Sequence, residues 1–242
     1  MKGLEICYED AELIIVNKPS GLLVIPDRFD EHAPTLKKEI EAYLGAKVFT
    51  VHRIDKDTSG VICFAKDETT HKYLSKLFEE HNIGKWYLGL VHGKLTPNTG
   101  SIENNLAEHP AKNGKMIIAH KGKFSHTDYE VVEEFKNYSL VSFQIHTGRT
   151  HQIRVHAKQI GHPIVADDIY GDGEKLLLSS IKKKNFKLSK AEEEERPLLA
   201  RQALHAHTLH FDLNGTNYQF EAPIPKDLAA TLKQLDKWNS EK

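Results

Sequence analysis

The sequence has little of several features that define other classes of protein. Among its 242 residues are only two cysteines, Cys7 and Cys63, each inside an apparent strand. Two isolated cysteines do not make a disulfide framework, so we expect buried, reduced thiols in a reducing compartment. No apolar run approaches the ~18 residues that a membrane-spanning helix needs, and the charges of Lys2 and Glu5 come too early for a signal peptide. These absences predict a soluble cytoplasmic protein without a membrane partner.

The chain also lacks a strong net charge. Its formal net charge is -1 with the 15 histidines counted as neutral. No overall positive field therefore attracts a polyanion, and such a partner would need a local basic patch. The composition, 39% hydrophobic and 28% charged, allows a sizeable core, and we expect a single domain over residues 1–242.

Three motifs of common enzyme classes are missing. The sequence contains no GxxxxGK[ST], no GxGxxG after a strand and no GxSxG. Their absence argues against nucleotide hydrolysis, dinucleotide redox chemistry and serine hydrolysis. Cys63 lies in an apolar run, where an inert core thiol is expected rather than a nucleophile.

Helical and strand patterns mix irregularly along the chain. Helical spacing of apolar positions begins at four points, Leu36, Asp67, His151 and Pro225. Most other apolar runs are typical of strands, and the Lys18–Gly21 turn between two of them predicts a hairpin. The charged stretch 171–196 predicts a solvated loop. Without regular βαβ alternation, the pattern indicates an α+β fold, with a largely antiparallel mixed sheet flanked by helices and loops.

Two carboxylates stand in the stretch VHRIDKDTSG, residues 51–60, directly before the apolar run VICFAK. If the stretch is extended, Arg53, Asp55 and Asp57 share one side. The residues alone leave three interpretations open. They are a structural charge network, an aspartic-protease-type pair based on DTSG, and a single carboxylate held ionised by a cation to act as nucleophile or base. No second DTG or DSG occurs, so the protease pair would require a homodimer.

A second cluster lies in HTGRTHQIRVHAK, residues 146–158. Its histidines recur every five residues, at His146, His151 and His156. Five residues turn a helix by about 500°, so these side chains do not converge, and we expect no metal site. On a helix, His151, Arg154 and Lys158 would form one stripe. The stripe is either a solvated face or a basic wall beside a cleft, with Arg149 just ahead of it.

Four stretches, in order and spacing, resemble the RluA-type RNA pseudouridine synthases. They are HRIDKDTSGVICFAK, KWYLGLVHG, HTGRTHQIRVHAKQIGHPIVADDIYG and RQALHAH, and the likeness extends from about Leu13 to about Pro223. The resemblance implies the pseudouridine synthase catalytic fold with a central active-site cleft and without a separate S4 domain. It also implies an isomerase that converts specific uridines of structured rRNA or tRNA to pseudouridine without a metal or other cofactor.

The resemblance further implies the roles of single residues. Asp55 would be the catalytic aspartate, Tyr87 would stack on the target uracil, and Arg154 would pair with the catalytic carboxylate. Ile54 stands where leucine is more usual, an apolar exchange of nearly equal volume. Asp57 would support the loop. The expected RNA-binding residues are Arg53, His52, Lys56, Arg149, His151 and Lys158.

The target base would have to be flipped out of its RNA stack into a pocket, because a stacked base cannot be reached. Whether the aspartate adds to C6 of uracil, attacks C1′ or removes a ribose proton stays open. We expect RNA as partner, no DNA, and a monomer. Two other functions remain open, an RNA-binding module that has kept the fold without turnover and a dimeric aspartic hydrolase.

Overall fold

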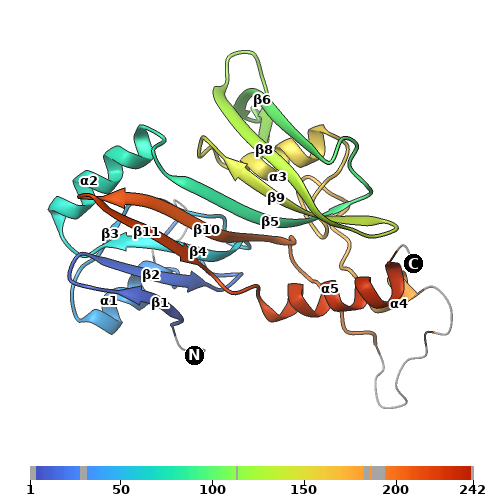
Figure 1. Cartoon of the computed structure of the whole chain (residues 1–242), viewed down its shortest axis with the longest axis horizontal. Coiled ribbons are helices and arrows are strands. Elements are labelled where there is room, and N and C mark those ends of the chain that lie inside the picture. Colours follow the sequence, from blue (N-terminus) through green and yellow to red (C-terminus); the bar gives the residue numbers. More distant parts are fainter. Residues whose placement is uncertain (1–3, 28–31, 113, 183–185, 187–193, 241–242) are drawn as a thin grey trace. The chain divides into compact units, whose positions relative to one another are not determined.

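The computed structural model describes residues 4–27, 32–112, 114–182, 186 and 194–240 (Figure 1). Its chain forms two compact units. The first comprises Met1–Tyr87, Gln144–His146 and His205–Pro223, and the second comprises Leu88–Phe143, Thr147–Leu204 and Ile224–Lys242. The chain passes repeatedly between these units, unlike two successive domains joined by one linker. One domain over residues 1–242 stays a prediction.

The first unit is built on a sheet whose strands are β1 (Ile6–Glu9), β2 (Leu13–Lys18), β3 (Phe49–Thr50), β4 (Ser59–Ala65), β10 (Leu204–Leu213) and β11 (Thr216–Glu221). They follow the order β1-β2-β4-β10, with β3 beside β4 and β11 beside β10. All seven residues of β4 are buried, as expected for a central strand. Most pairs are antiparallel, but β10 runs parallel to the start of β4.

Two helices belong to the first unit, α1 (Leu36–Leu44) and α2 (Glu68–Glu79), and both begin where the sequence predicts. The Asp67 carboxylate accepts hydrogen bonds from two amides of the first turn of α2. Gly45, with φ 65°, ends α1 in the left-handed conformation that favours glycine. The helix α2 ends at Glu79, His81 follows in the left-handed conformation at φ 60°, and Gly84 starts β5 (Gly84–His92).

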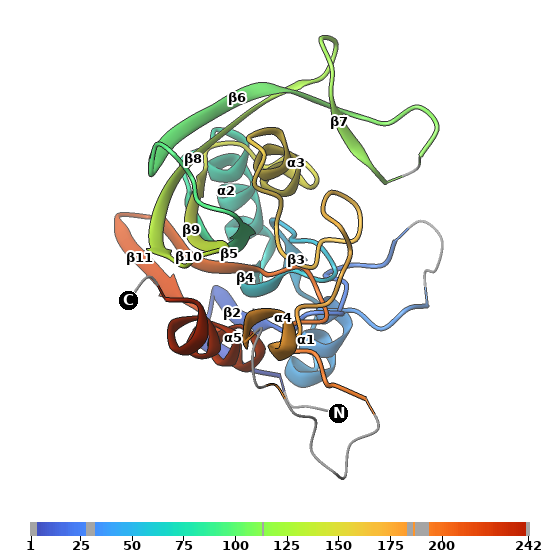
Figure 2. The same ribbon diagram turned by 90° about the vertical axis from the view of Figure 1, so that its right-hand side faces the viewer.

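The second unit contains β6 (Thr99–Glu108), β7 (Met116–Ile118), β8 (Lys123–Glu134), β9 (Tyr138–Ile145), α3 (Gln152–Gln159), α4 (Leu178–Lys182) and α5 (Lys226–Asn239). Its sheet has the order β9-β8-β6-β7, and α3 packs against β7 and β8. Figure 2 shows β6, β7 and β8 curving over α3. The helix α5 begins directly after Pro225, as predicted, and buries Leu228 and Leu235. Most of the charged stretch after Lys182 lies outside the described residues.

Two expectations for the N-terminal part are wrong. The hairpin forms between β1 and β2, and Leu23 makes only an isolated bridge with Thr35. Both edges of β2 are already paired with β1 and β4, so no edge is left for the residues after the turn. Cys7 is exposed rather than buried, because alternate residues of β1 face outward, whereas Cys63 is buried as expected. No helix in the described part of the chain is long and apolar enough to cross a membrane.

A wholly buried lysine fixes the turn that follows β2. Lys18 has no exposed surface, and its Nζ donates hydrogen bonds to the carbonyls of Pro19 at 2.9 Å, Leu22 at 2.7 Å and Lys56 at 2.8 Å. A buried ammonium is tolerated only where such acceptors replace its water. Because Lys56 belongs to the segment before β4, this side chain ties two separate loops together.

We predict that Lys18→Met lowers the free energy of unfolding by about 2–4 kcal/mol, because three carbonyls lose the buried ammonium that donates to them. Urea unfolding of wild type and variant measures the loss. Lys72→Met is the matched control, since Lys72 is exposed on α2 and should change stability by no more than about 0.5 kcal/mol. Equal unfolding midpoints for the two variants would contradict a structural role for the ammonium.

The second unit contains a buried histidine within a polar network. His156, on α3, has no exposed surface, and its Nδ1 lies 2.9 Å from the Thr127 Oγ1 of β8. Its Nε2 lies 3.0 Å from the Ser125 Oγ and 3.1 Å from the Asn104 Oδ1. Burial, with a smaller contribution from the charge of His126, lowers the pKa of His156 from 6.5 to about 4. The native state therefore holds the neutral imidazole.

This pKa predicts how acid affects stability. In the unfolded chain His156 binds its proton near pH 6.5, whereas in the native state it does so only near pH 4. Its contribution is thus complete above pH 6.5 and is lost as the pH falls toward 4. Urea unfolding at several pH values should show the stability advantage of wild type over His156→Gln shrinking across this window. A constant difference between the two proteins would refute the shifted pKa.

Candidate active site

The loop between β3 and β4 presents Asp55. Ile54 and Thr58 are buried, Arg53 and Asp57 are exposed, and Asp55 is half-buried between them. Lys56 is exposed as well, and residues 56 and 57 form a turn, so the extended backbone that would put Arg53, Asp55 and Asp57 on one side does not continue to Asp57. The Thr58 amide donates to the Asp55 carbonyl at 3.2 Å and closes a turn around the candidate carboxylate. The local geometry therefore directs Asp55 away from the core without exposing it fully.

The turn after β2 holds this loop by its backbone. The Lys56 carbonyl accepts from the Lys18 Nζ at 2.8 Å and from the Gly21 amide at 2.9 Å. The Asp57 carbonyl accepts from the Ser20 Oγ at 2.9 Å. Sequence reasoning identified residues 18–21 only as a turn and missed their second role. These hydrogen bonds fix the backbone of the loop on which Asp55 lies.

His52 fixes the entrance of the same loop. Its ring stacks on Phe78 with centroids 4.6 Å apart, and its Nε2 accepts from the Cys63 amide at 3.0 Å. Burial, followed by the charge of Lys85, lowers the pKa of His52 to about 3, so the ring is neutral. A neutral ring engaged with protein groups is suited to supporting the loop. Its RNA-binding role stays a prediction.

Tyr87, on β5, lies within electrostatic reach of Asp55. The side chain is 9% exposed, and burial together with the negative charge of Asp55 raises the pKa of its phenol. The hydroxyl is therefore protonated at neutral pH. The first unit thus brings together two of the predicted catalytic residues, a carboxylate and a neutral aromatic ring.

Arg154 is buried on α3, and its guanidinium is tightly paired. Its Nε and Nη2 donate to the two oxygens of Asp167 at 2.6 and 2.8 Å, and Nη2 lies 3.3 Å from Asp168 Oδ1. Its Cζ lies 5.1 Å from the centre of the Tyr170 ring. Arg154 is only 4% exposed, so the interpretation of His151, Arg154 and Lys158 as a solvated face is wrong. Arg154 faces Asp167 and Tyr170 rather than water.

Asp167 is a residue that sequence reasoning missed. Burial raises the pKa of its carboxyl, but hydrogen bonds and the charge of Arg154 outweigh this effect and hold the pKa below its usual range. The same carboxylate accepts from the amides of Ile169 and Tyr170, each at 2.9 Å. The only signal for Asp167 in the sequence is its place directly after the apolar residues Ile164, Val165 and Ala166. Because Asp55 and Arg154 belong to different units, their pairing stays a prediction.

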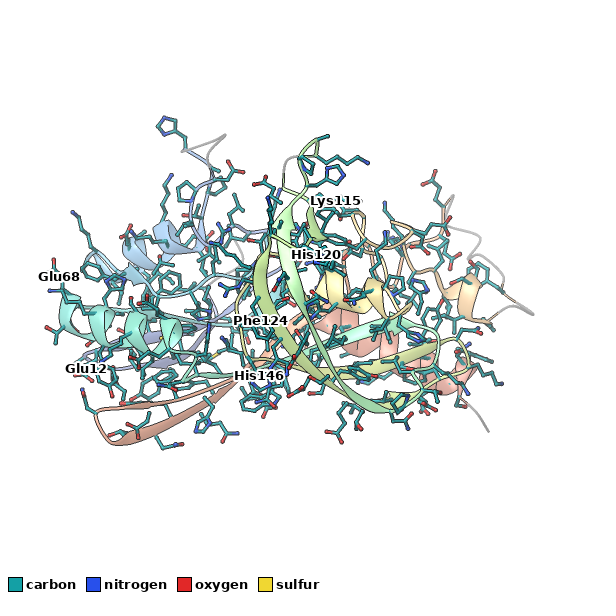
Figure 3. The ribbon with its side chains drawn as sticks, turned by 90° about the horizontal axis from the view of Figure 1, so that it is seen from above. Glu12, Glu68, Lys115, His120, Phe124 and His146 are labelled. Carbon is teal, nitrogen blue, oxygen red and sulfur yellow. The ribbon has the colours of Figure 1, made fainter. Side chains whose placement is uncertain are left out.

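A basic cleft of about 460 Å³ lies in the second unit. Its lining comes from β6, β7, the start of β8 and the turn before α3, and comprises Leu106, Ala107, Glu108, Met116, Lys121, Gly122, Lys123, Gly148, Arg149 and Thr150. The lining thus contains three cations, Lys121, Lys123 and Arg149, and one carboxylate, Glu108. The Arg149 Nε donates to the Phe124 carbonyl at 2.8 Å, which anchors that arginine. Figure 3 labels Lys115, His120 and Phe124, which mark the chain from β7 into β8.

Gly122 allows β8 to begin close beside β6. A Cβ at this position would lie 2.6 Å from the backbone of Leu106, so a larger residue would push the strands apart. On either side of Gly122, Lys121 and Lys123 are exposed, and neither ammonium has an ion-pair partner among the described residues. Both lysines were missed, because a Gly- and Lys-rich loop carries no motif. The cleft can hold an anionic strand by its phosphates.

The other expected RNA-binding residues do not line the basic cleft. Arg53 and Lys56 are exposed on the Asp55 loop, and Lys158 is exposed near the end of α3. The Nδ1 of His151 lies 3.0 Å from the hydroxyl of Tyr170. Of the predicted residues, only Arg149 lines the basic cleft.

Comparisons with known proteins identify the family. The family model of RNA pseudouridylate synthases matches residues 12–159. A ribosomal large subunit pseudouridine synthase D from Buchnera aphidicola is 35% identical over 238 residues, covering 96% of this chain and 73% of that protein. An uncharacterized RNA pseudouridine synthase, YlyB, from Bacillus subtilis is 33% identical over 249 residues, covering 97% of this chain and 73% of that protein.

The structure of human RNA Pseudouridylate Synthase Domain Containing 4 matches with a TM-score of 0.74 at 24% identity, covering 96% of this chain and 92% of that one. This likeness confirms the α+β fold of the pseudouridine synthases. The region matched by the family model includes Asp55, Tyr87 and Arg154. The expected family and enzyme class are confirmed: the chain belongs to the RNA pseudouridylate synthase family and is an RNA uridine isomerase.

Proposed function

We propose that this protein converts specific uridines of structured ribosomal RNA to pseudouridine, with Asp55 as the catalytic group. The observation that carries the proposal is the half-buried Asp55 carboxylate, on a loop fixed by its backbone, close enough to Tyr87 to raise the pKa of that phenol. The choice of ribosomal RNA draws on relatives such as the ribosomal large subunit pseudouridine synthase D of Buchnera aphidicola.

The reaction defines what the site must do. The bond between C1′ and N1 breaks, the uracil turns, and a bond between C1′ and C5 forms, while C5 loses a proton and N1 gains one. A carboxylate can act as nucleophile or base for these steps. Asp55 would supply this group from a loop whose backbone is fixed. The isomerisation consumes no oxidant, reductant or water.

Tyr87 would receive the flipped base. A uridine inside an RNA fold must leave its stack before C5 can be reached, and an aromatic ring replaces part of the lost stacking. The phenol of Tyr87 stays protonated, because burial and the charge of Asp55 both raise its pKa. A neutral ring can therefore contact the pyrimidine without adding a second negative charge beside the carboxylate.

Arg154 would supply the positive charge of the site. Its guanidinium is fixed by Asp167 and the Tyr170 ring, so its position costs little further ordering when RNA binds. Pairing of this cation with Asp55 is implied by the family resemblance. The basic cleft would bind the phosphates of the same RNA through Lys121, Lys123 and Arg149.

Asp55→Asn should reduce pseudouridine formation by at least about 1,000-fold, because the amide can act neither as nucleophile nor as base. Tritium release from 5-labelled uridine in ribosomal RNA measures turnover, and filter binding should show unchanged RNA affinity. Asp236→Asn, at an exposed position of α5, is the control and should retain most of the activity. Turnover by Asp55→Asn would reject the assignment. Binding without turnover by wild type would favour an RNA-binding module.

Replacing both Lys121 and Lys123 by alanine should weaken RNA binding and its dependence on salt. Each lost phosphate contact lowers the slope of log K against log salt by about 0.7 for single-stranded RNA, so the double variant should lose about 1.4. The control replaces Lys226 and Lys233, exposed lysines of α5 outside the cleft. An identical salt slope for wild type and the cleft variant would exclude these lysines from the RNA contact.

A further inference from the structure

The exit of the Asp55 loop contains a buried serine–histidine pair. Ser59 is the first residue of β4, directly after Thr58, whose amide closes the turn around Asp55. The Oγ of Ser59 lies 3.0 Å from the Nδ1 of His205 on β10. Ser59 is 3% exposed and His205 is fully buried, so water does not compete for this hydrogen bond. The pair joins residues 146 positions apart in the sequence.

The other ring nitrogen of His205 bonds to the backbone. Its Nε2 lies 3.2 Å from the Ala222 carbonyl, which can only accept, so Nε2 carries a hydrogen. The Nδ1 is hydrogen-bonded to the Ser59 hydroxyl. The ring thus links Ser59 on β4 to the Ala222 carbonyl.

The backbones of β4 and β10 lie very close together beside this pair. β10 runs parallel to β4 through two residue pairs, His205 with Ser59 and Ala206 with Gly60. Gly60 has φ 121°, and a Cβ there would lie 2.0 Å from the Ala206 carbonyl oxygen. Only glycine permits this approach. A shift of Ser59 toward or away from β10 would therefore either break the hydrogen bond to His205 or create a clash.

We propose that Ser59 and His205 are a positioning pair for Asp55, and this rests on the proposed function. The entrance of the loop is held by His52 and its middle by Lys18, whereas its exit is held by the Ser59–His205 bond. Neither residue touches the uracil or the reacting atoms. They act by fixing the backbone four residues after Asp55, so that the carboxylate meets the flipped base at one distance and angle.

Ser59→Ala should lower kcat by about 10- to 100-fold, the scale expected when a reacting group is misplaced by a fraction of an ångström to one ångström. KM for RNA should stay within about twofold, because the phosphate contacts are elsewhere. Ser139→Ala is the control, since the buried Ser139 hydroxyl donates to the Gly93 carbonyl at 2.8 Å in the second unit. It should lower the melting temperature comparably while kcat stays at the wild-type value.

Two replacements of His205 separate positioning from packing. His205→Asn places an acceptor oxygen where the imidazole carries Nδ1, so Ser59 keeps its partner. His205→Leu fills a similar space without an acceptor. We expect His205→Asn to retain at least about tenfold more kcat than His205→Leu. Equal kcat values for these variants, wild-type kcat for Ser59→Ala, or an equal kcat loss in Ser139→Ala would each overturn the proposal.

Hydrogen exchange tests the pair without depending on turnover. The Thr58 amide, which bonds to the Asp55 carbonyl, should exchange at least about tenfold faster in Ser59→Ala than in wild type, and no faster in Ser139→Ala. If wild type formed no pseudouridine, the proposed function would fail, and this measurement would still decide whether the pair fixes the loop. Unchanged exchange of Thr58 in Ser59→Ala would refute the inference.

Discussion

The carbonyl oxygen of Lys56 accepts two hydrogen bonds, from the Lys18 ammonium and the Gly21 amide, and the position of Asp55 depends on them. A loop that carries a reacting group loses rate when it moves, because the geometry of attack is demanding. Here the protein fixes the main chain on both sides of Asp55 and leaves its carboxylate at the surface of the first unit. The cost is a buried ammonium, which three carbonyls compensate.

The two units treat buried cations differently. The first surrounds the Lys18 ammonium with three carbonyl acceptors, from Pro19, Leu22 and Lys56. The second pairs Arg154 with Asp167, whose pKa lies below its usual range, and thereby fixes a planar guanidinium. Separate from both, the cleft gathers three cations in a chain whose net charge is -1. Local concentration of charge, rather than total charge, makes contact with a polyanion feasible.

Local signals in the sequence predicted those parts of the molecule that depend on neighbouring residues. The starts of α2 and α5 follow from Asp67 and Pro225. Contacts between distant segments were not predictable in this way. Neither the burial of Lys18 nor that of Arg154 has a local signal. Lys56, from a separate loop, supplies one of the three acceptors of Lys18, and Asp167 pairs with Arg154 from beyond the end of α3. The identity of the reaction came from the family resemblance, not from residue spacing.

We infer that the protein, through the Asp55 carboxylate, isomerises uridines of ribosomal RNA without a metal or another cofactor. Carbodiimide mapping of pseudouridine in unmodified ribosomal RNA transcripts, after incubation with the purified protein in the presence of a metal chelator, tests it most directly. The account predicts new pseudouridine at discrete uridines, with no change in RNA mass. Transcripts that stay unmodified, or that are modified only after a metal or another cofactor is added, would contradict it.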